Sequence, residues 1–243
     1  MAPALLPLWA AMLDAVRLRP GMRLLDAGCG SGESAALALA REAEVWGLDC
    51  SEEMLAVARR TAPRATLAHG DLETLPYPDS FFDAITACNS VHFAADPLRA
   101  MRELARVARP GSRIAITSTG TREELQVRSV IFEPAFALLD GAPPANPFLL
   151  SEPGVLEQLM ADAGLATAPN LKVLTEWSFA SFDEAWAAWR TIGPIAAVIK
   201  TVGEEAVRAA VEEAANRIAR RPDGEESAYV LRNWWHVVAA EPA

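Results

Sequence analysis

Three glycines spaced one residue apart are the first feature of this sequence that suggests chemistry. An apolar run ends at Asp26, and Gly28, Gly30 and Gly32 follow before an alanine- and leucine-rich stretch begins. Glycine is needed where φ is positive, or where a Cβ would collide with something lying against the main chain. The spacing therefore predicts a strand, a tight turn and a helix start, with a ligand touching the backbone at the turn.

Two further acidic residues follow predicted strands and by themselves indicate a nucleotide-containing ligand, while the adenine role of Asp71 is what the family resemblance described next implies. Asp49 closes the second predicted strand, where a carboxylate can accept hydrogen bonds from both hydroxyls of a ribose, in a dinucleotide as well as in other nucleosides. Asp71 follows the third strand and can accept from an adenine amino group, with Leu72 and Met54 as apolar neighbours of the ring. A dinucleotide turn normally has the spacing Gly-x-Gly-x-x-Gly, so the glycine spacing and Asp71 disfavour NAD(P).

Together these segments resemble the motifs of the class I S-adenosylmethionine-dependent methyltransferases. The resemblance is greatest to the methyltransferase type 11 group, which includes the ubiquinone and menaquinone biosynthesis enzymes, and it covers roughly Met22 to Ser118. Four spaced matches are a much stronger signal than one glycine-rich turn. The matching stretches are Arg23–Ser34, Gly47–Met54, Gly70–Leu72 and Leu75–Asp83.

The resemblance implies a cofactor, a fold and a set of binding residues. The cofactor is S-adenosylmethionine, which becomes S-adenosylhomocysteine. The fold is α/β, a Rossmann-like doubly wound and mostly parallel seven-stranded sheet with a terminal antiparallel hairpin and an inserted helical cap. The residues expected to bind the cofactor are Asp26, Gly28, Gly30, Gly32, Asp49, Cys50, Met54, Asp71, Leu72 and Asn89.

The elements that must position these residues follow from apolar patterning, since strand and helix signals alternate along the first half of the chain. After the first strand, further strands are predicted at Glu44–Leu48, Ala65–Ala68, Phe81–Cys88, Ser112–Ser118, Leu171–Phe179 and Tyr229–Ala239. Helices are predicted around Leu5–Val16, at Ser31–Arg41 and Ser51–Thr61, from Asp96, over Val130–Leu139, after a Ser151 cap, after a Ser181 capping box and at Glu204–Ala219. We expect one domain over 1–243, with a core of 20–120, 151–180 and 226–240 and helical cap insertions at approximately 121–141 and 181–221.

Two kinds of residue are candidates for contact with a methyl acceptor. His92 follows the fourth strand and, by analogy with the family, faces the transfer site, where an imidazole can take a proton or simply shape the pocket. Aromatic residues gather in the last third, with Phe182, Trp186 and Trp189 on one helical face. Such a stripe is more often core, but it would also suit an apolar or aromatic small molecule.

Composition limits the partners. The net charge is −10, from 22 basic and 32 acidic residues, which disfavours a nucleic-acid substrate. The one tight basic cluster, around Arg217 and Arg220, is expected to complement a helix dipole. Three cysteines without Cys-x-x-Cys spacing indicate neither a disulfide framework nor a metal site and fit a reducing cytoplasm. We expect no export signal and no membrane span.

Three functions remain open at this stage. The favoured one is methyl transfer from S-adenosylmethionine to O, N or C of a small molecule. A protein with the same fold and cofactor could instead catalyse cyclisation or act as a binding module, and the sequence does not separate these from methyl transfer. An NAD(P)-dependent oxidoreductase is the less favoured third.

Overall fold

A mixed sheet forms the centre of the computed structural model, which describes residues 2–141, 146–219 and 229–242. Its strand order is β3-β2-β1-β4-β5-β8-β6, and β7 also pairs with β8. The first five strands are parallel: β1 (Arg23–Ala27), β2 (Glu44–Asp49), β3 (Thr66–His69), β4 (Phe82–Ala87) and β5 (Ala108–Thr119). The chain order reverses direction between β1 and β4, so their carboxyl ends form the switch point where open sheets bind ligands. The predicted Rossmann-like fold class is confirmed.

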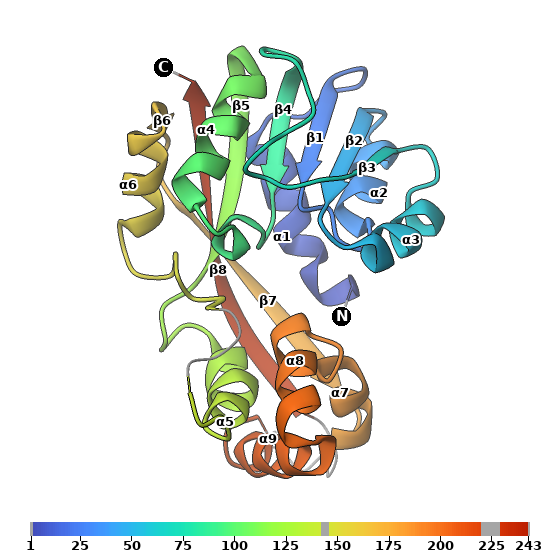
Figure 1. Ribbon diagram of the computed structural model, residues 1–243, viewed down its shortest axis with the longest axis vertical. Helices are drawn as coiled ribbons and strands as arrows, with labels where there is room; N and C mark the ends of the chain where they lie inside the picture. Colours follow the sequence, from blue (N-terminus) through green and yellow to red (C-terminus); the bar gives the residue numbers. More distant parts are fainter. Residues whose placement is uncertain (1, 142–145, 220–228, 243) are drawn as a thin grey trace.

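Helices cover both faces of this sheet (Figure 1). The helices α1 (Ala2–Ala15) and α2 (Glu33–Ala40) bury their apolar side chains in one core, together with strand residues such as Leu24. On the other face, α4 (Pro97–Val107) and α6 (Val155–Asp162) form a second core with strand residues such as Ile85. The helix α3 (Glu52–Thr61) packs beside β2, β3 and α2, and the short η1 (Val91–Phe93) links β4 to α4.

The antiparallel end of the sheet has one strand more than predicted. β8 (Tyr229–Pro242) runs antiparallel to β5, and β7 (Leu171–Phe179) pairs with β8 as the predicted hairpin. The short β6 (Leu165–Thr167) also pairs with β8, so the described residues form eight strands and the predicted seven is wrong. Pro169 lies between β6 and β7 and has no N–H to donate, which explains the break in this edge.

Beyond the sheet, β7 and β8 continue as a two-stranded ribbon that carries a lobe of helices (Figure 1). Since β8 rises toward the C-terminus in this view and is antiparallel to β5, the parallel strands point down toward the lobe. Its elements are η2 (Arg128–Phe132), α5 (Glu133–Phe136), α7 (Phe182–Trp189), α8 (Gly193–Val202) and α9 (Glu204–Ile218). The last three are inserted between β7 and β8, in the place of the predicted cap. The predicted boundary positions 220–221 and 226–228, with Arg220, fall outside the described residues.

The aromatic stripe of α7 lies inside this lobe. Trp189 is fully buried and Phe182 and Trp186 nearly so. The ring of Trp189 meets Phe179 edge-on at 5.5 Å, and Phe182 lies 5.9 Å from Tyr229. These contacts favour the interpretation of the stripe as core rather than as an acceptor wall.

The predicted N-terminal helix connects the two parts of the molecule. Leu8, Met12 and Leu13 of α1 are fully buried, and α1 contacts β5, β7, β8 and α2. It therefore packs on the core.

Helix starts follow local chemistry, with one error in prediction. Ser51 Oγ accepts from Met54 N at 3.2 Å, as predicted for an N-cap, and Ser181 Oγ accepts from Glu184 N at the start of α7. Ser151 does not cap α6, which begins at Val155. A proline at 153 disfavours helical conformation in the residue before it, and the Ser151 hydroxyl donates to Phe148 O instead. The helix predicted over Val130–Leu139 is a π-helical turn that continues into α5 and ends at Phe136, after Pro134.

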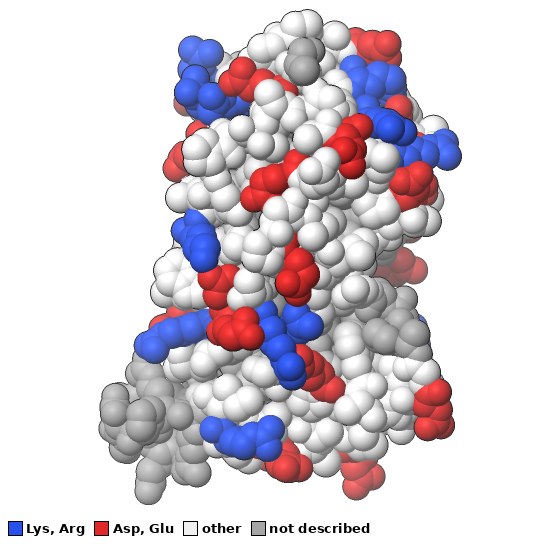
Figure 2. Space-filling view, turned by 90° about the vertical axis from the view of Figure 1, so that its left-hand side faces the viewer, with Lys and Arg blue, Asp and Glu red and all other residues white. Residues whose placement is uncertain are grey.

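The surface mixes charges of both signs. On the described part of the face shown in Figure 2, acidic and basic side chains are interleaved and neither forms a broad patch. In the described ranges, every helix is too short or too polar to cross a membrane.

Candidate functional site

The glycine turn after β1 packs directly against the segment that follows β4. Gly28 has a φ of +77°, and a Cβ built there would lie 2.3 Å from the Cβ of Ser90. The Ser90 hydroxyl donates to Ala27 O at 2.7 Å, which fixes this approach. Only glycine fits at position 28, and the two turns meet at the switch point of the sheet.

Asp49 holds the same turn from the end of β2. Its Oδ2 accepts from Gly30 N at 2.8 Å, and its Oδ1 accepts from Ser51 N at 2.9 Å. Each carboxylate oxygen has two lone pairs, so both can still accept from a ribose hydroxyl. Gly30 has a φ of +53°, and a Cβ there would meet no described atom within 4 Å, so the space over this residue is open. Gly32 differs, because its Cβ would lie 3.0 Å from Ala58 and the residue is needed for close packing on α3.

Asp26 sits beneath the turn and is 1% exposed. Its Oδ1 accepts from Thr86 Oγ1 at 3.3 Å, whereas its Oδ2 is buried and has no hydrogen-bond partner among the described residues. Burial raises the pKa of this carboxyl to about 7, against the lowering effect of the Thr86 hydrogen bond. An unpartnered buried oxygen is costly, so a ligand that supplies a cationic or N–H donor here would stabilise the site.

The ends of β2 and β3 are tied together, which places the predicted adenine contacts near Asp49. Gly70 N donates to Asp49 O at 3.1 Å, and His69 Nε2 donates to Cys50 O at 3.0 Å. Asp71 follows at once and is exposed, with one oxygen accepting from Glu73 N. His69 thus links the end of β3 to the loop after β2.

Two apolar residues, Met54 and Leu72, are the predicted neighbours of the adenine ring beside Asp71. Met54, in the first turn of α3, is 43% exposed, and Leu72 is half-buried against the core. An exposed methionine and a partly exposed leucine suit a flat apolar ring, and the second carboxylate oxygen of Asp71 can accept from its polar edge. Cys50 is exposed as well, and partial burial with the nearby Asp49 charge raises its thiol pKa, so the thiol stays protonated near neutral pH.

Asn89 lies at the end of β4 in a left-handed backbone conformation, with a φ of +52°. Its N–H donates to Thr117 Oγ1 at 2.9 Å, and the Thr117 hydroxyl lies 3.1 Å from Asn89 Oδ1, to which it donates. The neighbouring β5 therefore holds both the backbone and the side chain of Asn89.

His92 is 6% exposed on η1, three residues after Asn89. Its ring lies 4.2 Å from that of Phe93 and has no hydrogen-bond partner in the described part of the chain. Burial lowers the pKa of the imidazole to about 4, so the ring is neutral over the physiological range. A neutral ring without partners can form a hydrogen bond with an incoming group or accept a proton from it.

The structure thus gathers the predicted residues at the carboxyl ends of β1 to β4, in the loops that follow these strands and in the helices α3 and η1. Sequence reasoning missed Thr86, Ser90 and Thr117, which orient Asp26, the glycine turn and Asn89. Single threonine and serine residues in or beside apolar strands belong to no recognisable sequence motif. A polar residue inside an otherwise apolar strand nevertheless indicates that its hydroxyl has a specific partner. Across the described residues, no cluster of His, Cys, Asp and Glu could hold a metal ion.

S-adenosylmethionine fits the chemistry of this site. The unpartnered Asp26 Oδ2 can receive a positive or N–H-bearing end, the open space over Gly30 can receive main-chain contacts, and Asp49 has free lone pairs for a ribose. These features agree with the expectation, from the sequence and the family resemblance, that Asp26, the glycine turn and Asp49 bind the cofactor.

Comparison with known proteins agrees with this assignment. Residues 25–116 match the family model of a methyltransferase domain. The 27-O-demethylrifamycin SV methyltransferase of Amycolatopsis mediterranei is 41% identical over 106 residues, which cover 41% of this chain and 39% of that protein. A demethylmenaquinone methyltransferase of Beutenbergia cavernae is 35% identical over 115 residues, covering 47% of this chain and 48% of the relative.

Among solved structures, the [4+2]-cyclase SpnF superposes with a TM-score of 0.64 over 97% of this chain and 81% of its own, at 23% identity, which shows the shared fold. The chain spans less than half the length of the two methyltransferases above. The matched region nevertheless contains the glycine turn, Asp49, Asp71 and His92. Over residues 25–116 the chain is therefore similar to the class I S-adenosylmethionine-dependent methyltransferases, whose methyltransferase domain it matches.

Proposed function

We propose that the protein transfers the methyl group of S-adenosylmethionine to O, N or C of a small apolar or aromatic molecule. The observation that carries this proposal is the buried, unpartnered Oδ2 of Asp26 beneath an open glycine turn. This oxygen lacks a hydrogen-bond donor, and the ammonium group of a ligand with an amino acid end would supply one.

The residues have separate tasks. Asp26 and the backbone of the glycine turn bind the methionine end, Asp49 binds the ribose, and Asp71 with Leu72, Cys50 and Met54 binds the adenine. Asn89 lines the space beside the sulfonium. The sulfonium supplies an activated methyl group, so the protein acts mainly by orienting donor and acceptor in line and excluding water.

His92 is our candidate for the acceptor side. Its neutral ring can take a proton from a hydroxyl or amine acceptor, although a base with a pKa of about 4 is weak at neutral pH. We therefore give it the role of orienting the acceptor first and of proton acceptor second.

A small-molecule acceptor is supported by the names of the two relatives, which refer to demethylated menaquinone and rifamycin. The net charge of −10 and the mixed charges in Figure 2 also argue against a nucleic acid. Three free cysteines, Cys29, Cys50 and Cys88, suit a reducing compartment such as the cytoplasm.

A second function is favoured by one specific observation. The [4+2]-cyclase SpnF shares the fold along nearly the whole chain. The same cofactor site with a lobe of different shape could therefore catalyse cyclisation, or bind without reaction. An NAD(P) oxidoreductase is disfavoured because Asp71 and the glycine spacing do not suit a dinucleotide.

Titration calorimetry with S-adenosylmethionine, S-adenosylhomocysteine and NAD tests the cofactor. We expect micromolar binding of the first two and no heat from NAD. Asp49→Ala should weaken binding by about 1–3 kcal/mol, because ribose hydroxyls and Gly30 N both lose their acceptor. Binding of NAD alone would reject the proposal, and binding of S-adenosylmethionine without S-adenosylhomocysteine formation across a panel of acceptors would favour the second function.

A further inference from the structure

The predicted adenine contacts lie on a segment with little structure of its own. Residues 70–80 connect β3 to β4, and the only β-pairing inside them is a bridge between Asp71 and Thr74. Asp71 O also accepts from Thr74 N at 3.1 Å. Glu73 N donates to Asp71 Oδ1 at 2.9 Å, so the turn sets the carboxylate relative to its own backbone, but it does not fix the place of the whole segment against the sheet. The rest of the segment must be held from outside.

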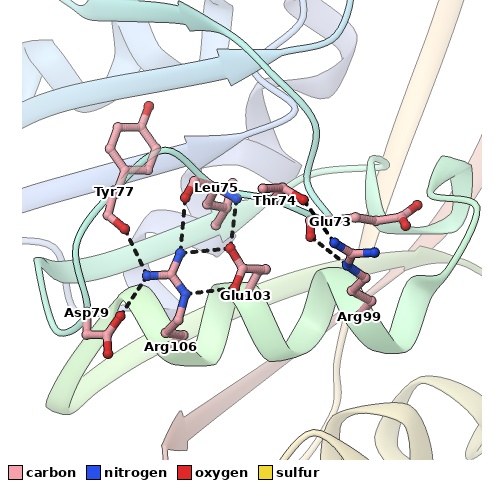
Figure 3. A network of polar contacts seen from close by, with 8 residues as sticks. All are labelled: Glu73, Thr74, Leu75, Tyr77, Asp79, Arg99, Glu103 and Arg106. Atoms are coloured by element: carbon pink, nitrogen blue, oxygen red, sulfur yellow. Dashed lines mark hydrogen bonds and ion pairs between the residues drawn. The ribbon is translucent and has the colours of Figure 1, made fainter.

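Arg106 of α4 holds that segment with three of its five N–H donors (Figure 3). Its Nη1 donates to Tyr77 O at 2.9 Å and to Asp79 Oδ1 at 2.7 Å, and its Nη2 donates to Leu75 O at 3.0 Å. The remaining two bonds, from Nε and Nη2, go to the two carboxylate oxygens of Glu103, both at 2.7 Å. A guanidinium has five N–H groups in a fixed plane, and all five are used.

Glu103 orients the guanidinium and also touches the segment directly. Its Oε2 accepts from Leu75 N at 2.8 Å, so the N–H and the C=O of one residue are both bound by the same ion pair. Glu103 is largely buried and Arg106 about one-third exposed, which limits screening by solvent. Leu75 itself is buried in the core beneath, so the clamp has an apolar anchor.

One turn further along the same helix face, Arg99 extends the clamp toward Asp71. Its Nε donates to Glu73 O at 3.0 Å and its Nη2 to Thr74 Oγ1 at 3.2 Å. Glu73 Oε1 in turn accepts from Asp96 N at the start of α4. Positions 99, 103 and 106 share one face of a helix, so a single rigid element binds the segment from residue 73 to residue 79 (Figure 3).

We propose that Arg106, oriented by Glu103, is a positioning residue for the adenosyl half of the cofactor. It touches no part of the predicted ligand, but it fixes the segment that presents Asp71 and Leu72 to the adenine. This inference rests on the proposed function, since it assigns a task to α4 only if an adenosine-containing ligand binds there.

The test is calorimetric titration of the full chain with S-adenosylhomocysteine, comparing Arg106→Gln with Arg109→Gln. Arg109 is a matched control, because it also pairs with a carboxylate, Asp83, and donates to a loop carbonyl, Ser80 O, beyond the clamped segment. We expect roughly 10- to 100-fold weaker binding for Arg106→Gln, since charge-assisted hydrogen bonds are lost, and little change for Arg109→Gln.

Kinetics separate positioning from general damage. At saturating S-adenosylmethionine, kcat of Arg106→Gln should approach that of the unchanged protein, while KM for the cofactor rises. Arg106→Lys keeps the charge beside Glu103 but cannot reach both carbonyls in a fixed plane, so its affinity should be intermediate.

The outcomes are distinct. Folded Arg106→Gln with unchanged S-adenosylhomocysteine affinity overturns the inference, as does an equal loss of affinity in Arg106→Gln and Arg109→Gln. If Arg106→Gln does not fold, Arg106→Lys and the exposed Arg99→Gln decide by the same two criteria. Failure of the unchanged protein to bind S-adenosylhomocysteine would instead reject the proposed function.

Discussion

Two side chains fix the backbone of the glycine turn, while Asp26 Oδ2 and Ser34 Oγ beneath it, like several buried groups in and beside the helical lobe, have no hydrogen-bond partner in the described residues. Asp49 and Ser90 bind backbone groups at 2.7–2.9 Å. In contrast, Trp177 Nε1, Trp189 Nε1 and Asn233 Nδ2 are buried and unpaired. The turn is thus organised by directional hydrogen bonds and the lobe by aromatic packing. The difference indicates that hydrogen bonds set the geometry of the turn, while the lobe is held by the same apolar core that contains α1, α2 and one face of the sheet.

Trp189→Ala gives the largest effect that tests this separation. Removing a fully buried indole should lower the free energy of unfolding by about 3–5 kcal/mol, measured by urea denaturation. Affinity for S-adenosylhomocysteine should stay within about twofold, because the residue lies in the lobe and not at the strand ends. Trp234→Ala, at a more exposed position on β8, is the control and should cost less than about 1 kcal/mol. A parallel loss of cofactor affinity in Trp189→Ala would show that the two regions are one unit.

Asp26→Asn sharpens the comparison, because Asp26 carries an unpaired buried carboxylate oxygen beneath the turn. Its pKa rises from an ordinary 3.8 to about 7 on folding, so between these pH values the folded state keeps a proton that the unfolded chain has lost. The free energy of unfolding contributed by this group therefore falls as pH rises from about 4 to 7 and is lowest above 7. Asparagine does not ionise, so the variant should be more stable than the unchanged protein by about 4 kcal/mol at pH 8 and by less than about 1 kcal/mol at pH 4.

The same substitution should act on binding in the opposite direction. A neutral amide offers no charge to the cationic end of S-adenosylmethionine, so affinity should drop at pH 8 while stability increases. Urea denaturation at pH 4 and pH 8, with titrations at pH 8, gives both quantities. Equal stability of the two proteins at pH 8 would mean that Asp26 is ionised in the folded protein at little cost in free energy. The unpartnered oxygen would then no longer support binding of a cationic ligand.

The contrast between the regions also explains what sequence could predict. The Ser51 cap depends on Met54, three residues away, so spacing was sufficient to predict it. The glycine turn and Asp49 were predicted from their motif, although their contacts with Ser90, Ala58 and Gly30 come from other parts of the chain. Thr86, Ser90 and Thr117 contact residues 28 to 63 positions away, and the Arg106 clamp reaches back to residues 75–79. Side chains that act across strands or from a distant helix face leave no local pattern.

Errors in the second half have similar causes. The break between β6 and β7 falls at Pro169, where the register on β8 shifts by one residue, and the late start of α6 follows Pro153. The aromatic stripe of α7 had two interpretations because amphipathic spacing does not tell which surface covers it. Packing against Phe179 and Tyr229, far apart in sequence, distinguished them.

His92→Gln tests the acceptor side of the candidate site, since η1 follows β4 and leads into α4. Glutamine retains hydrogen-bonding capacity but cannot take up a proton. If His92 accepts the proton of the substrate, kcat should fall by about 100-fold, the low end for general base catalysis because the ring is a weak base. Affinity for S-adenosylhomocysteine should be unchanged. A rise in acceptor KM with kcat preserved would instead identify His92 as a wall of the pocket.

The pH dependence of His92 provides the independent check. Burial lowers the pKa of its imidazole from an ordinary 6.5 to about 4, so an acid limb due to this residue should lie near pH 4 and not near 6.5. Below 6.5 the unfolded chain takes up a proton that the folded state refuses, and stability should fall by up to about 3 kcal/mol as pH drops to 4. Titration of the histidine ring signals by NMR, with His92→Gln for assignment, measures the pKa without any acceptor. A value near 6.5 would mean that water reaches the ring freely, and the pocket beside η1 would then be open before the acceptor arrives.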